Sequence, residues 1–160
     1  MYEAEFCVPD QKFSAMPNVL IVSNCPSDNT ARLQEAVVKG CRNDHFKDMQ
    51  IRAHIPWDAG PDDGMWANGV IWGTTENCGY MSGAIKAFLE SFSYACLENT
   101  DGLPVALFVK GGLDGQGAKS SVERIITGLR WKLIQPPLVM KGDFQPGFLD
   151  SCEELGMTMC

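Results

Sequence analysis

Residues 18–30 have the sequence NVLIVSNCPSDNT, a short apolar run followed by a polar stretch rich in turn-forming residues. A continuous apolar run of this length is typical of a parallel strand that is buried on both faces. The next residues follow a helical period, with Leu33, Val37 and Cys41 on one face. A strand that leads through a loop into an amphipathic helix predicts an α/β fold.

The same alternation continues along the chain. Four more strands are expected, at 49–55, 69–73, 103–109 and 136–140. Helical patterns follow the strands at 69–73, 103–109 and 136–140, and the last of them covers 147–159. Residues 56–66 are rich in Pro, Gly and Asp, so the second helix is expected to be short or absent. This order predicts a parallel sheet with helices on both faces.

Length and charge limit the remaining possibilities. The chain has 160 residues, which suits one domain, expected at 18–160. Residues 1–17 are expected to be an N-terminal arm or an upstream extension. The net charge of -7 argues against a nucleic-acid partner. No apolar run reaches the roughly 20 residues that cross a membrane, so no membrane partner is expected.

The cysteines suggest a reducing compartment. There are seven, an odd number, and none forms a Cys-x-x-Cys pair. Neither of the two histidines lies at a ligand spacing from a cysteine pair, so no metal site is predicted. Most of these cysteines are expected to be small buried residues, and the protein is expected to be cytoplasmic.

Three polar loops follow the first, third and fourth expected strands, at 23–30, 74–81 and 110–117. In open α/β sheets, ligands bind beyond the carboxyl ends of the strands. The first loop leads into a helix, whose free N–H groups suit a phosphate. The alternative is an ordinary helix cap at Ser27 or Asp28. The Asp28 carboxylate would repel a phosphate unless it points outward. For the second loop, the alternative is a strand–helix turn capped by Ser82.

Several catalytic motifs are missing. The third loop has the glycine spacing of a P-loop, but Ala118 separates Gly117 from the Lys-Ser pair. The dinucleotide fingerprint lacks its third glycine, and no Gly-x-Ser-x-Gly elbow occurs. With two histidines in the chain, a Ser-His or Cys-His pair has little support, and no catalytic side chain is predicted.

Two of these segments resemble a known family. VLIVSNCPSDNT (19–30) resembles the first strand and phosphate loop of flavodoxin-like proteins. GVIWGTTENCGYMSGAIKAFLE (69–90) is similar to the third strand, flavin loop and following helix of flavodoxin-like NAD(P)H:quinone and FMN reductases. Residues 105–117 resemble the fourth strand and its loop. The resemblance implies a three-layer flavodoxin-like fold with a five-stranded parallel sheet of order 2-1-3-4-5.

Position by position, the resemblance implies FMN as cofactor. The implied cofactor-binding residues are Cys25, Ser27, Asn29 and Thr30 for the phosphate; Thr75, Glu76, Asn77, Cys78 and Gly79 for the isoalloxazine ring; and Lys110, Gly111, Gly112 and Asp114 near the ring or ribityl chain. Glu76 is expected either to orient its loop or to disfavour the anionic reduced flavin. Tyr80, Trp57 and Trp66 are candidates to stack on the ring, and for the tryptophans packing in the core or at an interface is the favoured alternative. Residues that depart from the family pattern are Cys25, Asp28, Thr75 and Cys78.

The resemblance further implies an oxidoreductase in which the flavin carries the chemistry. A hydride or electrons would pass from NAD(P)H through FMN to a quinone or another small acceptor. In a single domain of this size, NAD(P)H would have to reach the flavin directly. Two alternatives stay open: a flavodoxin-type electron carrier without its own substrate, and a flavodoxin-like fold that has lost FMN. The shortened second helix would open the site or provide a homodimer surface.

Overall fold

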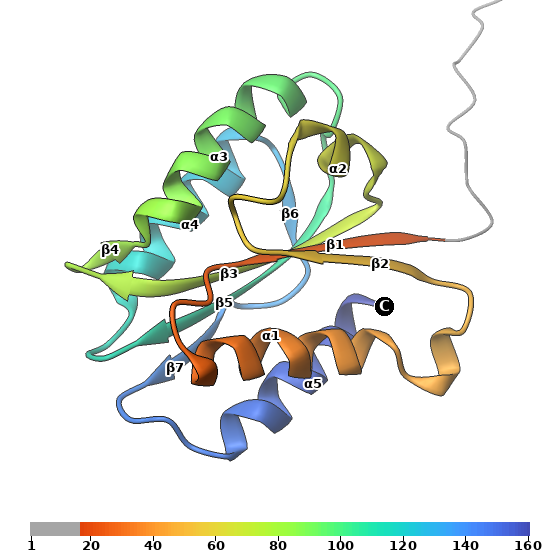
Figure 1. Cartoon of the computed structure of the whole chain (residues 1–160). Coiled ribbons are helices and arrows are strands. Elements are labelled where there is room, and N and C mark those ends of the chain that lie inside the picture. Colours follow the sequence, from red (N-terminus) through yellow and green to blue (C-terminus); the bar gives the residue numbers. More distant parts are fainter. Residues whose placement is uncertain (1–16) are drawn as a thin grey trace, which may run out of the picture.

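Seven strands form the middle layer of the structure, a computed structural model that describes residues 17–160 (Figure 1). The expected arm at 1–17 lies, except for residue 17, outside the described residues. The strands are β1 (Asn18–Ser23), β2 (Gln50–His54), β3 (Gly69–Asn77), β4 (Tyr80–Met81), β5 (Pro104–Gly111), β6 (Lys132–Leu133) and β7 (Leu138–Lys141). The helices are α1 (Asp28–Cys41), a 3₁₀ turn (Asp44–Phe46), α2 (Pro61–Trp66), α3 (Gly83–Cys96), α4 (Gln116–Gly128) and α5 (Gly147–Met159).

The sheet has the strand order β2-β1-β3-β5-β6, and β7 also pairs with β5. β6 and β7 lie parallel to opposite ends of β5, so they are two halves of one interrupted fifth strand. Pro136 and Pro137 fall between them and have no N–H to donate to the ladder. Counted in this way, the sheet confirms the predicted order 2-1-3-4-5.

Helices cover both faces of the sheet, as predicted: α1 and α5 lie on one face and α2, α3 and α4 on the other (Figure 1). Successive residues of β1 point to opposite faces. Val19 and Ile21 pack under α1 and α5, while Leu20 and Val22 join the cluster on the opposite face. All four are almost fully buried, which explains why the run is continuously apolar.

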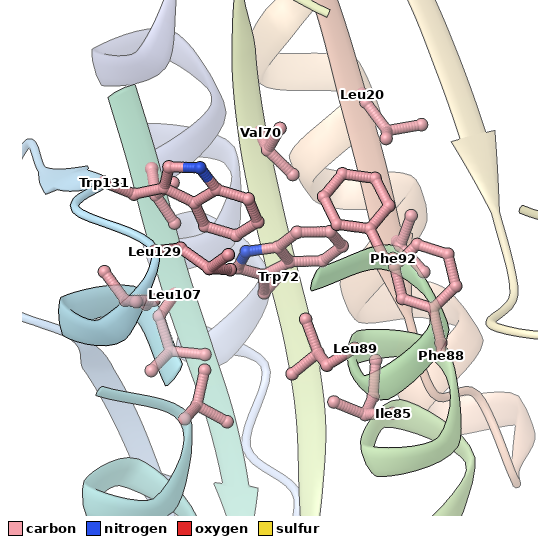
Figure 2. Close-up of a cluster of buried hydrophobic side chains, with 14 of the residues drawn as sticks. Leu20, Val70, Trp72, Ile85, Phe88, Leu89, Phe92, Leu107, Leu129 and Trp131 are labelled. Carbon is pink, nitrogen blue, oxygen red and sulfur yellow. The ribbon is translucent and has the colours of Figure 1, made fainter. Parts of the chain in front are cut away.

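An aromatic cluster packs against the middle of β3 (Figure 2). Trp72 is completely buried and stacks on Trp131, with ring centroids 5.8 Å apart. Phe88 and Phe92 of α3 complete the cluster, and the centroid of each ring lies 5.4 Å from that of Trp72. The Trp131 indole N–H donates to Thr100 Oγ1 at 2.8 Å. Because such cores are close-packed, the cluster holds β3 in place ahead of the hairpin into which the strand leads.

The second helix is short, as predicted, because α2 spans six residues. Its neighbour β2 is the edge strand, and its residues are half-buried or exposed. No helix within 17–160 is both long and apolar enough to span a bilayer. Among the same residues, no group of three or more His, Cys, Asp or Glu side chains could hold a metal ion.

Candidate functional site

The carboxyl ends of β1, β3, β5 and β7 meet at one edge of the sheet. The strand register places Ser23 beside Gly73, and Thr75 beside Lys110. Three of the predicted loops therefore start next to one another. The loop after β7, which the sequence analysis did not consider, starts at the same edge because β7 is parallel to β5.

The first loop ends in a helix cap. Thr30 N–H donates to Ser27 Oγ at 3.3 Å, and Ser27 N–H donates to Thr30 Oγ1 at 3.0 Å. The Thr30 hydroxyl in turn donates to the Ser27 carbonyl at 2.8 Å. The cap at Ser27, expected as the alternative to a phosphate loop, is thus present. Within the described chain, the N–H groups of Asp28 and Asn29 have no hydrogen-bond partner, so the N-terminus of α1 still has open donors.

The Cys25 thiol is half-buried and hydrogen-bonded within the protein. It donates to Gln34 Oε1 and lies near Ser23 Oγ, each at 3.4 Å. Burial is the main cause that raises the pKa of the Cys25 thiol, which keeps it neutral. Asp28 and Asn29 are exposed, and Asp28 is the first residue of α1.

The second loop is a β-hairpin, so the expectation of a loop over 74–81 is wrong for most of its length. β3 continues to Asn77 and pairs antiparallel with β4. Cys78 and Gly79 connect them with φ of 52° and 69°. Two positive φ values in a two-residue connection form a type I′ turn, whose twist matches that of the strands. Ser82 then caps α3 by accepting from Ile85 N–H at 3.2 Å, as the alternative for this loop predicted.

Asn24 links the first loop to the hairpin. Its side-chain amide donates to Thr75 Oγ1 at 3.0 Å, and its backbone N–H donates to the Gly73 carbonyl at 2.9 Å. The Thr75 hydroxyl donates to Asn77 Oδ1 at 2.6 Å. Thr75, a predicted residue of the second loop, is therefore held by Asn24, a residue of the first loop that sequence reasoning missed.

Close packing joins the hairpin to the third loop. The Glu76 carboxylate accepts from Gly115 N–H at 3.0 Å. A Cβ at Gly117 would lie 1.7 Å from the Gly79 carbonyl oxygen, so the hairpin turn rests directly on the first turn of α4. Gly112 and Asp114 are exposed, and Asp114 Oδ1 accepts from Gln116 N–H at 3.0 Å.

Lys110 contributes to a different part of the site from its loop neighbours. Its ammonium donates to the carbonyl oxygens of Gly142 and Gly111. It borders a cavity of about 250 Å³ at the N-terminus of α1. The cavity is lined by Ser27, Asn29, Thr30, Leu33, Lys110, Gly142, Asp143 and Phe144. The missed residues Gly142, Asp143 and Phe144 belong to the loop after β7, and the rule about carboxyl ends would have found them.

The three candidates for ring stacking differ in exposure. Trp57 is 70% exposed and Tyr80 is 46% exposed, so both rings are accessible. Trp66 is partly buried under the Arg52 guanidinium, which lies 4.0 Å from its ring centre. Cys78 is exposed at the hairpin turn.

Known proteins share this fold. No protein-family model matches the chain. A flavodoxin from Aquifex aeolicus (strain VF5) is 26% identical over 114 residues, which cover 71% of this chain and 60% of that relative. The structure of a flavodoxin from the domain Archaea matches with a TM-score of 0.76 and 19% identity, over 89% of this chain and 95% of that one. The fold is flavodoxin-like.

The flavodoxin-like fold also occurs as part of longer proteins. Rubredoxin oxygen:oxidoreductase from Desulfovibrio gigas matches with a TM-score of 0.73 and 13% identity, over 90% of this chain and 36% of that one. These comparisons confirm the predicted fold class and support the resemblance to flavodoxin-like proteins. The narrower resemblance to NAD(P)H:quinone and FMN reductases stays a prediction.

Proposed function

We propose that this protein binds FMN at the carboxyl ends of β1, β3 and β5 and transfers electrons. The observation that carries the proposal is a juxtaposition. The N-terminus of α1, with its open N–H groups, shares one edge of the sheet with a hairpin that is braced against α4. The relative from Aquifex aeolicus and the archaeal structure described above are both named flavodoxin.

The first loop fits a phosphate through its backbone. The N–H groups of Asp28 and Asn29 and the dipole of α1 favour an anion. The hydroxyls of Ser27 and Thr30 face the same cavity and would exchange their mutual hydrogen bonds for bonds to the phosphate. Lys110 adds a positive charge at the rim of that cavity. Two features oppose binding: Pro26 has no N–H, and Asp28 is negatively charged.

The second and third loops fit a flat ring through exposed backbone. A Cβ at Gly79 or at Gly112 would meet no atom within 4 Å, so these backbone segments are open to a ligand. Asn77, Cys78 and Asp114 are exposed beside them. Thr75 and Glu76 fix the hairpin through their hydrogen bonds to Asn24 and Gly115. Bound FMN would supply the redox chemistry, and the protein would orient the ring and shield one side of it.

Two forms of this function differ in their electron donor. As a flavodoxin-type carrier, the protein would exchange electrons with protein partners, and the relatives named flavodoxin favour this form. As an oxidoreductase, it would pass electrons from NAD(P)H to a quinone or another small acceptor. The sequence Gly73-Thr74 to Met81-Ser82, which resembles the reductase flavin loop, favours the second form.

Spectroscopy of the purified protein tests both steps. Reconstitution with FMN is expected to give a yellow protein with absorbance near 450 nm and quenched flavin fluorescence. Steady oxidation of NADH or NADPH with a quinone would then identify the oxidoreductase, and its absence would identify the carrier. A protein that takes up no FMN would contradict the proposal and favour a flavodoxin-like fold that has lost its cofactor.

A further inference from the structure

Glu76 is the one predicted ring-loop residue whose side chain reaches the third loop. Its Oε2 atom accepts from Gly115 N–H at 3.0 Å. The side chain starts from β3, whereas Gly115 precedes α4, 39 residues later. We propose that Glu76 is a positioning residue that fixes the spacing between the β3–β4 hairpin and the third loop. Its consequence for flavin binding rests on the function proposed above.

Among the described residues, Glu76 provides the hydrogen-bond acceptor for the Gly115 N–H. Gly115 is the N-cap residue of α4, and having no side chain it makes no side-chain cap hydrogen bond. It is buried, and its φ of +70° lies in the left-handed region that favours glycine. A buried N–H without a partner is costly, so a distant side chain has to accept from it. Glu76 does so from the neighbouring strand.

The charge of Glu76 suits this position. The carboxylate takes part in no ion pair among the described residues, so no lysine or arginine holds it in place. Instead it lies at the N-terminus of a 13-residue helix, where a negative charge is favoured by the helix dipole. Hydrogen bonds from backbone N–H to carboxylate are also about twice as strong as neutral ones.

The glycines around the contact leave room for it. A Cβ at Gly111 would lie 3.0 Å from Glu76 Oε2 and 2.9 Å from the backbone of Gly115. The backbone of Gly117 packs against the hairpin turn at Gly79. The carboxylate therefore sits where the hairpin, the end of β5 and the start of α4 are all in contact. Losing it would let the hairpin and the third loop move apart.

This role predicts a pattern of effects on two ligands. The hairpin and the part of the third loop that Glu76 joins to it are assigned to the ring or ribityl chain, whereas Lys110, at the start of that loop, borders the phosphate cavity. Replacing Glu76 should thus weaken the binding of FMN and of riboflavin equally, because riboflavin has the same ring and lacks the phosphate. A change in the first loop should affect FMN alone.

The test compares Glu76→Ala, Glu76→Gln and the control Glu98→Ala. Glu98 is exposed in the turn after α3 and makes no ion pair among the described residues, so its removal changes the charge equally. In the flavin-free protein, Glu76→Ala should speed hydrogen exchange of the Gly115 amide about tenfold or more. Glu76→Gln keeps a carbonyl acceptor and should restore most of the protection. Glu98→Ala should leave it unchanged.

Flavin titrations of the same variants complete the test. Glu76→Ala should weaken FMN and riboflavin alike, by about tenfold, while Glu76→Gln stays within about threefold of the wild type. Unchanged exchange at Gly115 in Glu76→Ala, or weakening of FMN alone, would overturn the proposal. A wild-type protein that binds neither flavin would overturn the proposed function and the flavin role of Glu76. The exchange rate would still decide whether the contact to Gly115 exists.

Discussion

Replacing Gly117 by alanine tests whether the hairpin rests on α4. The added Cβ would lie 1.7 Å from the Gly79 carbonyl oxygen and 2.6 Å from its carbonyl carbon. Ordinary contacts of this kind begin near 3.4 Å, so the hairpin turn has to move by about 1.7 Å. The neighbouring atoms are backbone and cannot rotate away. The substitution therefore displaces the backbone that is proposed to contact the ring.

The expected effects can be worked out from this displacement. Overpacking costs about 1–3 kcal/mol, and alanine returns up to about 1 kcal/mol of helix propensity. The free energy of unfolding should therefore fall by at most about 3 kcal/mol, and the protein should still fold. Losing one or two backbone hydrogen bonds to the ring, at about 1 kcal/mol each, should weaken FMN about five- to thirtyfold.

Gly128→Ala is the matched control, because Gly128 ends the same helix and a Cβ there meets no atom within 4 Å. It should stabilise the protein by about 0.5–1 kcal/mol and leave FMN binding unchanged. Urea unfolding and fluorescence titration with FMN measure both quantities. If Gly117→Ala matched Gly128→Ala in stability and bound FMN as the wild type does, the contact between hairpin and helix would be refuted.

Three further substitutions have expected outcomes. Asp28→Asn should raise the affinity for FMN about two- to fivefold and leave that for riboflavin unchanged, since it removes a charge beside the proposed phosphate site. It should also lower the free energy of unfolding by about 0.3–1 kcal/mol, because Asp28 begins α1. Unchanged FMN affinity would place the phosphate elsewhere. Lys110→Met should weaken FMN about three- to tenfold and spare riboflavin, and equal losses for both would contradict a phosphate role. Burial raises the pKa of Asp63, but hydrogen bonds from Gly60 N–H and Arg52 outweigh it and hold the pKa below its usual value. Its stabilisation is therefore present at neutral pH and lost as the pH falls below about 4. Asp63→Asn should cost about 0.5–1 kcal/mol at pH 7 and little at pH 3 in thermal unfolding, and an equal loss at both would exclude the charge as the cause.

The strands and long helices could be predicted because their side chains follow simple periods. The run Val19–Val22 is apolar since both faces of β1 are covered, and the last helix at 147–159 was predicted with its observed bounds. Local pattern was sufficient in both of these cases. Of the six cysteines in residues 17–160, only Cys41, Cys96 and Cys152 are buried, so the expectation that most cysteines are buried holds for half of them.

The hairpin could not be predicted because its turn lacks a local signal. Asn-Gly or Asp-Gly usually marks a type I′ turn, whereas Cys78 here adopts a positive φ that few residues other than glycine adopt. The contacts of Asn24 with Thr75 and of Glu76 with Gly115 depend on strand register. Register brings together residues that are 51 and 39 positions apart, which no local period reveals. The binding roles of the predicted site residues stay predictions.

An NMR titration of the flavin-free protein with FMN tests the central proposal most directly. The proposal predicts that backbone amide shifts concentrate in three segments: 24–30, 74–82 and 110–117. The amides of Asp28 and Asn29 should shift with FMN and remain in place with riboflavin, while those of the hairpin should shift with both. Absence of shifts, or shifts gathered at the amino ends of the strands, would contradict FMN binding at this edge of the sheet.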